Sequence, residues 1–495
     1  THHMFAHSKI HAALFSAALC LCNSAAADSL QFQSAREMQH ELVILVDFPD
    51  SQMQFSAETF RNALNAEKYD GECSTGSVAD YFDNSSHGAY RPVFDVFGIY
   101  TLPENSTYYG ENDISGNDRR ADEMIVEACR LAAADGIDLS KYDHDFDGTI
   151  DCVHVIYAGE GESADGLPDA VRPMHATTSA AIANGISIGE YTCCNASCEA
   201  FKREIGSSFA GIGQFVQNFA HAIGLPYLYS TSRYNTRHTP GIYDLMDSGF
   251  RLNFNRTPAS LSAYERMLLG WLRPQQINPP KEGCTASLPS IDEGTALLFT
   301  SGSVAHNMDA SDPYPKIFYL LENKSGQGWD KFLNDSAAPF YDRDGDEGLL
   351  ITKIIYDEQK WETNMVNYSS PHGVAYICEE DDSGYFPILP GTKRQTKIEF
   401  DSFSIRNIHR DSDTGTVSFV ISDSNGHSGV NAMPLDAPTI VGGTGAIKID
   451  GHFDSIAIFS LSGAMIYRGT DAEIKVPHGF YVVRVDETTA KVIVR

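Results

Sequence analysis

The chain has 495 residues, which is too long for one compact core and predicts roughly two to four domains. Its 66 acidic and 36 basic residues give a formal net charge of −30, which disfavours nucleic acid and anionic membrane surfaces as partners. Hydrophobic residues at 42% and charged residues at 21% are ordinary for a globular protein. The acidic excess suits either simple solubility or a protein that collects calcium.

Residues 1–27 have the pattern of a signal peptide. Lys9 precedes an apolar run at 10–21, and Ala25-Ala26-Ala27 supplies the small residues of a cleavage site. The run is too short to span a bilayer, and no later stretch reaches the length of a membrane helix. We therefore expect export to the medium or the cell surface, with no membrane insertion.

Eight cysteines follow the predicted cleavage point. An oxidising compartment favours structural disulfides for some of them, although the sequence cannot select a pairing. Cys193, Cys194 and Cys198 lie close enough together to suggest a metal site as the alternative. Zinc sites built on cysteine usually have a second cysteine pair, and none follows here, so disulfides are the preferred prediction.

Strand and helix patterns alternate over residues 28–275, which predicts a mixed α/β domain. Largely apolar runs predict buried strands at 42–48, 93–99 and 152–158. Helical patterns are expected at 118–134, within 205–222 and at 258–271. The second helix is stopped by Gly224-Leu225-Pro226, a glycine with a proline just beyond.

After residue 275 the pattern changes to short strands separated by turns, as in a β-sandwich. The clearest strands of the predicted 276–425 domain are 296–299, 316–321, 348–355 and 416–421. Residues 426–445 predict a linker, and 446–495 a small all-β unit. The expected fold class is multidomain α+β.

An acidic segment at 143–151 has the front half of an EF-hand-type calcium loop. Carboxylates stand at loop positions 1, 3, 5 and 9, Gly148 permits the sharp turn, and Thr149 offers a backbone carbonyl at position 7. The glutamate expected at position 12 is replaced by His154. The candidate calcium ligands are Asp143, Asp145, Asp147, Thr149 and Asp151. The alternative is an acidic turn before a strand.

The helix within 205–222 decides the function. In a zincin helix two histidines four residues apart bind Zn²⁺, and a glutamate beside the first is the general base for the attacking water. Here His221 and Gly224 are present, but Gln217 stands at the first histidine position and Asn218 at the glutamate position. A single histidine on a helix is more often a core residue than a ligand.

Many motifs in the same order make residues 42–351 resemble the secreted metallopeptidases of the immune inhibitor A type, a family with a zincin-like catalytic domain. The resemblance runs through the segments 43–48, 77–82, 143–151, 243–249, 257–258, 264–271, 321–324 and 348–351. It implies a methionine turn at Met246, and at Tyr227 it implies the position of an acidic third ligand. Three of the four functional positions, Gln217, Asn218 and Tyr227, therefore differ from the family, and only His221 is retained.

A neutral amide is a poor zinc ligand, and loss of a general base alone forfeits a factor of about 10²–10⁴ in rate. We therefore expect no bound zinc and a proteolytically inactive family member, a pseudopeptidase that binds an unidentified peptide or protein if it binds anything. The alternatives are an active zinc endopeptidase with substituted ligands and a purely structural surface protein.

The C-terminal unit carries a second resemblance. Residues 456–463, 477–485 and 491–495 are similar to the C-terminal sorting domains of the type IX secretion pathway. The resemblance implies an outer-membrane export machine as a partner. The alternative is an accessory β-domain that stays attached.

Overall fold

The computed structural model describes residues 40–162, 168–183, 186–230, 239–333, 347–381, 397–425, 439–442, 445–450, 453–460, 465–477, 479–486 and 488–494, with the short pieces 232, 384–386 and 388–389. The predicted signal peptide and most of the predicted linker lie outside these residues. Within them, no helix has the length and apolarity needed to cross a membrane.

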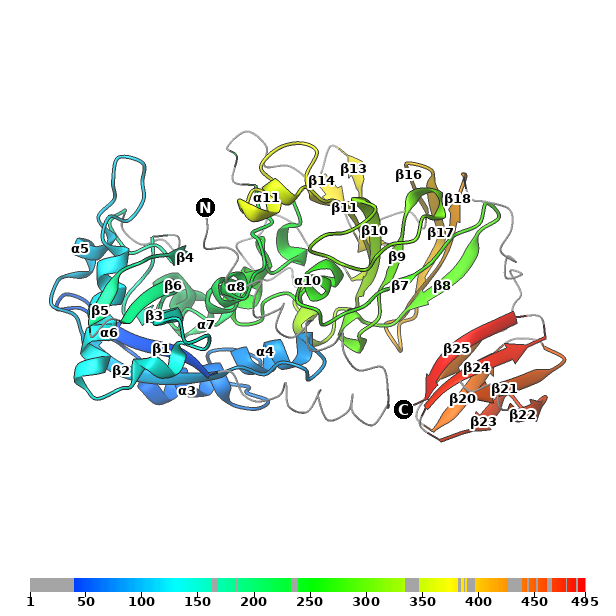
Figure 1. The fold of residues 1–495 in the computed structure, drawn as a ribbon, viewed down its shortest axis with the longest axis horizontal. Coiled ribbons are helices and arrows are strands. Elements are labelled where there is room, and N and C mark those ends of the chain that lie inside the picture. Colours follow the sequence, from blue (N-terminus) through cyan, green and yellow to red (C-terminus); the bar gives the residue numbers. More distant parts are fainter. Residues whose placement is uncertain are drawn as a thin grey trace.

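A mixed sheet organises the first half of the chain (Figure 1). Its strands follow the order β2-β1-β3-β6-β4, with β5 also paired to β6. The first four are parallel to their neighbours, whereas β4 and β5 run antiparallel to β6. The strands are β1 (His40–Asp47), β2 (Val93–Thr101), β3 (Thr149–Tyr157), β4 (Met174–Thr177), β5 (Ala181–Ala183) and β6 (Ile186–Asn195). All three strands predicted from apolar runs are confirmed as β1, β2 and β3.

Helices cover both faces of this sheet, which explains why β1 is apolar along almost its whole length. Val43 and Leu45 pack on one side with α3, α4 and α8, whereas Leu42, Ile44 and Val46 pack on the other with α5 and α6. All five side chains are fully buried. The helices are α3 (Ala57–Asn65), α4 (Val78–Ser85), α5 (Ser106–Gly110), α6 (Ala121–Ala134), α7 (Glu199–Ile205), α8 (Gly213–Ala222), α9 (Leu252–Asn255) and α10 (Ala263–Leu268).

Two of the predicted helices are shorter than expected. The 205–222 region contains the end of α7 and all of α8, because Gly206 adopts a left-handed conformation (φ +79°) that terminates α7. Of the 258–271 segment only α10 is α-helical. Its start is fixed at Ser262, whose hydroxyl and backbone form a capping box with Glu265.

The second half of the described chain is rich in β-structure (Figure 1). One sheet has the order β12-β11-β10-β9-β7, with β15 paired to β11, and a second has the order β16-β17-β18-β8. Side chains from both sheets share one core, as predicted for a β-sandwich. The elements are β7 (Gln275–Gln276), β8 (Cys284–Leu288), β9 (Leu297–Phe299), β10 (Ile317–Lys324), β11 (Gly348–Ile355), α11 (Glu358–Glu362), β12 (Val374–Tyr376), β13 (Glu379–Asp381), β14 (Gly384–Phe386), β15 (Ile388–Leu389), β16 (Lys397–Phe400), β17 (Phe403–Arg410) and β18 (Val417–Asp423).

The largest hydrophobic core continues across the predicted boundary at residue 275. Phe318 and Leu320 of β10 belong to the same core as Val43 of β1 and Phe219 of α8, while Tyr319 and Leu321 face the sandwich interior. Strand β10 is therefore buried on both faces, and the mixed-sheet region and the sandwich are packed against each other.

Charged side chains are buried where these two regions meet. Lys324 is fully buried, and its Nζ donates to the Ser260 carbonyl oxygen at 2.9 Å. Its charge faces Glu322 Oε1 at 3.5 Å and Asp330 Oδ1 at 3.9 Å. Asp330 in turn accepts hydrogen bonds from the backbone and hydroxyl of Ser260. The network ties β10 to the segment that precedes α10.

The C-terminal strands form a small unit with its own core, drawn in orange and red in Figure 1. Its two sheets have the orders β19-β20-β23 and β22-β21-β24-β25. The unit is all-β as predicted, but it begins earlier, because β19 lies within the predicted linker and pairs with β20. The strands are β19 (Thr439–Gly442), β20 (Ala446–Asp450), β21 (Ile456–Ser460), β22 (Met465–Gly469), β23 (Glu473–Lys475), β24 (Gly479–Val485) and β25 (Thr488–Val494).

The predicted disulfides are not found among the cysteines of the core. Six cysteines are free thiols, and most of these are buried as small apolar side chains. They are Cys73, Cys129, Cys152, Cys193, Cys194 and Cys284. These six form no disulfide: Cys193 and Cys194 are adjacent in β6 and pack on opposite faces of the sheet, and the other four lie on different segments of the fold.

We predict that Lys324→Met lowers the free energy of unfolding by about 3–5 kcal/mol, because it leaves two buried carboxylates without their cation. Chemical denaturation of the full chain measures this change. Lys316→Met is the matched control, since Lys316 pairs with Asp312 in an exposed ion pair worth about 0–1 kcal/mol. Equal effects of the two substitutions would contradict the role given to Lys324.

Candidate functional site

Helix α8 carries three of the four positions that a zincin site would use. Phe215, Val216 and Phe219 pack into the core, which fixes the rotation of the helix. Gln217 and Asn218 are 4% and 1% exposed, and His221, one turn further on, is partly buried. Because residues four apart lie on one face, Gln217 and His221 are neighbours along the helix.

Gln217 is held by the turn that contains Met246. Its Nε2 donates to the carbonyl oxygens of Leu245 and Asp247, both at 2.8 Å. Met246 between them is fully buried, so the predicted methionine turn lies directly against this position. Both protons of the amide are used, and the Oε1 atom lies 3.4 Å from the side-chain nitrogen of Gln214.

The Asn218 amide likewise forms hydrogen bonds with backbone carbonyl groups, here those of the sheet. Its Nδ2 donates to the Cys193 carbonyl oxygen at 3.1 Å and to the Met174 carbonyl oxygen at 3.4 Å. Its Oδ1 accepts a hydrogen bond from Gln214 at 3.1 Å. A neutral amide does not accept a proton near pH 7, so this position offers no general base.

His221 lies in a turn made possible by Gly224, whose φ is +111°. The turn brings the Leu225 carbonyl oxygen to Nδ1 of His221 and stacks the Tyr227 ring on the imidazole at a centroid distance of 4.1 Å. Burial, reinforced by the nearby His175, lowers the pKa of His221 to about 4. Burial also raises the pKa of Tyr227, whose hydroxyl forms a hydrogen bond with the His175 backbone. Both side chains are therefore neutral near pH 7.

His175 and Glu190 complete the site and were missed in the sequence. His175 Nε2 lies 2.7 Å from Glu190 Oε2, and the His175 ring is 4.5 Å from the His221 ring. These residues come from β4 and β6. A four-residue strand gives no usable periodicity, and its antiparallel pairing with β6 has no local signal in the sequence.

The four family positions do not fit a zinc ion. Zinc prefers imidazole, thiolate and carboxylate donors. Of the four, only His221 has such a donor, because Gln217 and Asn218 are neutral amides bonded to backbone carbonyls and Tyr227 is a buried phenol stacked on His221.

Residues 30–271 match the family of the immune inhibitor A peptidase M6 catalytic domain. The match covers the mixed sheet, α8 and the Met246 turn, and it supports the resemblance drawn from the sequence motifs. Residues 30–271 are thus similar to an immune inhibitor A-type peptidase domain, over just under half of the chain. A comparison with curated proteins finds no match.

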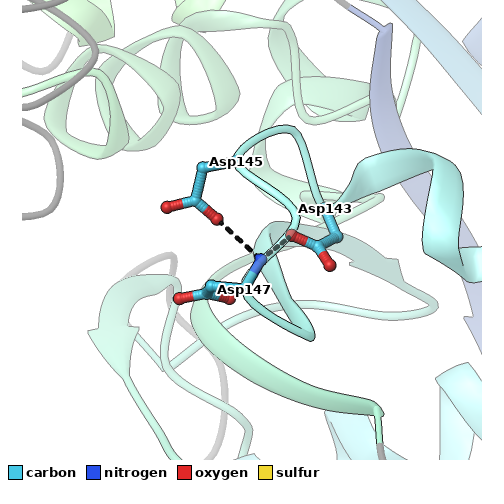
Figure 2. A group of neighbouring side chains, drawn as sticks. All are labelled: Asp143, Asp145 and Asp147. Carbon is cyan, nitrogen blue, oxygen red and sulfur yellow. Dashed lines mark hydrogen bonds between the residues drawn. The ribbon is translucent and has the colours of Figure 1, made fainter.

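The acidic loop of the peptidase domain brings three of its five candidate ligands together. Figure 2 shows the carboxylates of Asp143, Asp145 and Asp147 around the Asp147 backbone nitrogen, which donates to Asp143 and Asp145 at 3.1 and 3.2 Å. One ligand atom from each of the three aspartates lies within 4.8 Å of the others. Desolvation and the neighbouring carboxylates raise the pKa of the exposed Asp145.

The other two candidates are placed differently. Asp151 accepts hydrogen bonds from the backbone and Nδ1 of His144, at 2.9 and 2.7 Å. Thr149 begins β3, and its backbone nitrogen donates to Asp147 Oδ1 at 2.8 Å. His154, at loop position 12, is fully buried in β3 and bonded to Thr192, as expected for a strand residue.

We predict that His221 makes the protein less stable toward acid. Since its folded pKa of about 4 is below the unfolded value of about 6.5, the unfolded chain binds the proton more readily. The stability contribution is complete above pH 6.5 and is lost as the pH falls toward 4. Denaturation midpoints between pH 7 and 4 should therefore fall less in His221→Gln than in the unsubstituted chain. The exposed His409→Gln is the control, and an identical profile for all three proteins would contradict the assignment.

Proposed function

We propose that this protein is a secreted homologue of the immune inhibitor A-type metallopeptidases that binds peptide or protein in its cleft without hydrolysing it. The observation that carries the proposal is the bonding of Gln217 and Asn218. Their amide protons are donated to four backbone carbonyl oxygens, at the positions of the metal ligand and the base.

The chemistry of hydrolysis supports inactivity. A zinc ion lowers the pKa of its bound water to about 7, and without it the attacking water stays protonated. The missing base costs a further factor of about 10²–10⁴. The amides also satisfy the backbone around α8, so the fold is stable with no ion at these positions.

The edge of the mixed sheet supports peptide binding. In the described part of the chain, β4 pairs only with β6, so its other edge is where we propose that a strand of another chain adds. Tyr227 uses one backbone group of this edge at His175. At the opposite edge, Asn65 and Arg61 of α3 cover the backbone of β2 at Phe94 and Val96. A peptide would therefore add at β4, beside His221.

Calcium is the second part of the proposal. Asp143, Asp145 and Asp147 offer hard oxygen donors on one turn, and a Ca²⁺ ion would relieve the repulsion among them. Since this ion takes six to eight ligands, water and backbone oxygens would supply the rest. We assign it a structural role in fixing the loop before β3.

Export is the third part. The signal-peptide pattern of residues 1–27 supports secretion or display at the cell surface, and the two small sheets of 439–494 support a sorting domain. We propose an outer-membrane export machine as the partner of this C-terminal unit.

We predict that the triple substitution Gln217→His, Asn218→Glu and Tyr227→Asp restores zinc binding and chelator-sensitive cleavage of a peptide library. Cleavage products of this variant would identify the preferred sequence of the cleft. The unsubstituted chain should bind the same peptides and leave them intact.

Two controls make this experiment decisive. Gln217→His alone restores one ligand without a base, so cleavage should stay absent. A folded triple variant that neither gains zinc nor cleaves peptide would contradict the alignment of α8 with the zincin helix. Failure of the unsubstituted chain to bind the identified peptides would favour a purely structural surface protein.

We predict that calcium at about 100 times its Kd stabilises the protein by about 2–3 kcal/mol, and that a calcium chelator reverses this gain. Thermal denaturation with and without calcium measures it. Asp145→Asn should abolish the response, whereas Asp312→Asn on an exposed loop should keep it. A response that survives Asp145→Asn would place the ion elsewhere.

A further inference from the structure

Two histidines of the candidate site lie against each other and come from different elements. His175 of β4 and His221 of α8 have ring centroids 4.5 Å apart and ring planes at 86°. His175 is not one of the family positions, and its side chain is 11% exposed. The pair therefore differs from the ligand set that the family resemblance implies for zinc.

The hydrogen bonds of the pair determine which nitrogens are free. The Leu225 carbonyl oxygen can only accept, so Nδ1 of His221 carries the proton and Nε2 keeps its lone pair. The Glu190 carboxylate likewise accepts from Nε2 of His175, which leaves the lone pair of neutral His175 on Nδ1. Histidines that bind metals show this same pattern, with the second nitrogen donating to a carbonyl or carboxylate oxygen.

The donors also indicate the kind of ion. Imidazole nitrogen suits copper and zinc, and the affinity of such a site is higher for Cu²⁺ than for Zn²⁺. The one group of three His, Cys, Asp or Glu ligands found in the described residues is the acidic loop, so no third such side chain joins the two histidines. Water would complete the coordination. Stacking of Tyr227 restricts the rotation of the His221 ring.

We propose that His175 and His221 together bind a Cu²⁺ ion, with Glu190 as a positioning residue for His175. The site needs neither Gln217 nor Asn218. Because Asn218 stands at the position of the family's general base and is an amide, we expect the bound ion not to hydrolyse peptides.

The test is a Cu²⁺ titration of the full chain. Calorimetry measures the affinity, and electron paramagnetic resonance counts the nitrogens bound to copper. We expect two imidazole nitrogens. Removal of either histidine, in His175→Ala or His221→Ala, should weaken this site at least about ten-fold, and Glu190→Gln should weaken it about 10–100-fold. His2, His3 and His7 offer imidazoles elsewhere in the chain. The copper binding of each variant is therefore compared with that of the unsubstituted protein.

The exposed His409→Ala should leave the titration unchanged. Circular dichroism confirms that each variant is folded, and His175→Gln and His221→Gln replace any alanine variant that is not. Loss of the site in the His221 variants but not in the His175 variants would overturn the proposal, as would a spectrum with one nitrogen. Copper binding without peptide cleavage supports it. Metal-dependent cleavage by the unsubstituted chain would contradict the proposed function, while the nitrogen count would still decide the assignment of the pair.

Discussion

The two hydrogen bonds from the Gln217 amide to the Leu245 and Asp247 carbonyl oxygens are the constraint on which the candidate site depends. They join α8 to the Met246 turn at the point where a metallopeptidase would hold its ion. A metal site contributes to folding because its ligands are organised by the ion. Here a neutral amide satisfies two buried carbonyl groups directly, so the same helix and turn stay together with no ion between them.

The turn is itself anchored to the β-rich region through buried charges. Asp244 accepts a hydrogen bond from the Met246 backbone and forms another with Glu265 of α10. Burial, with the charge of Asp244, raises the pKa of Glu265 well above its usual range. The positive charge of Lys324 on β10 opposes the rise that burial causes in the pKa of Asp244. The Met246 turn is thereby held in place by both regions of the chain, which share one core.

The sequence predicted the features that depend on local patterns and missed those that depend on pairing across the sheet. The apolar runs of β1 and β3 and the turn at Gly224 are local, and all were predicted. The short strand β4 carries no periodicity, so the contact of His175 with His221 could not be anticipated. The grouping of Asp143, Asp145 and Asp147 was expected from their spacing, but the pairing of Asp151 with His144 depends on how the loop closes. Disulfides were predicted from the compartment, whereas the positions of the thiols depend on the fold.

Chelator-sensitive peptide cleavage by the full, unsubstituted chain is the measurement that tests the account most directly. A broad peptide library is incubated with the purified protein, with zinc supplied and with a strong zinc chelator. We predict no cleavage under either condition, because the α8 positions that would provide the first ligand and the base are amides bonded to the backbone. Cleavage that requires zinc and disappears with the chelator would contradict the account.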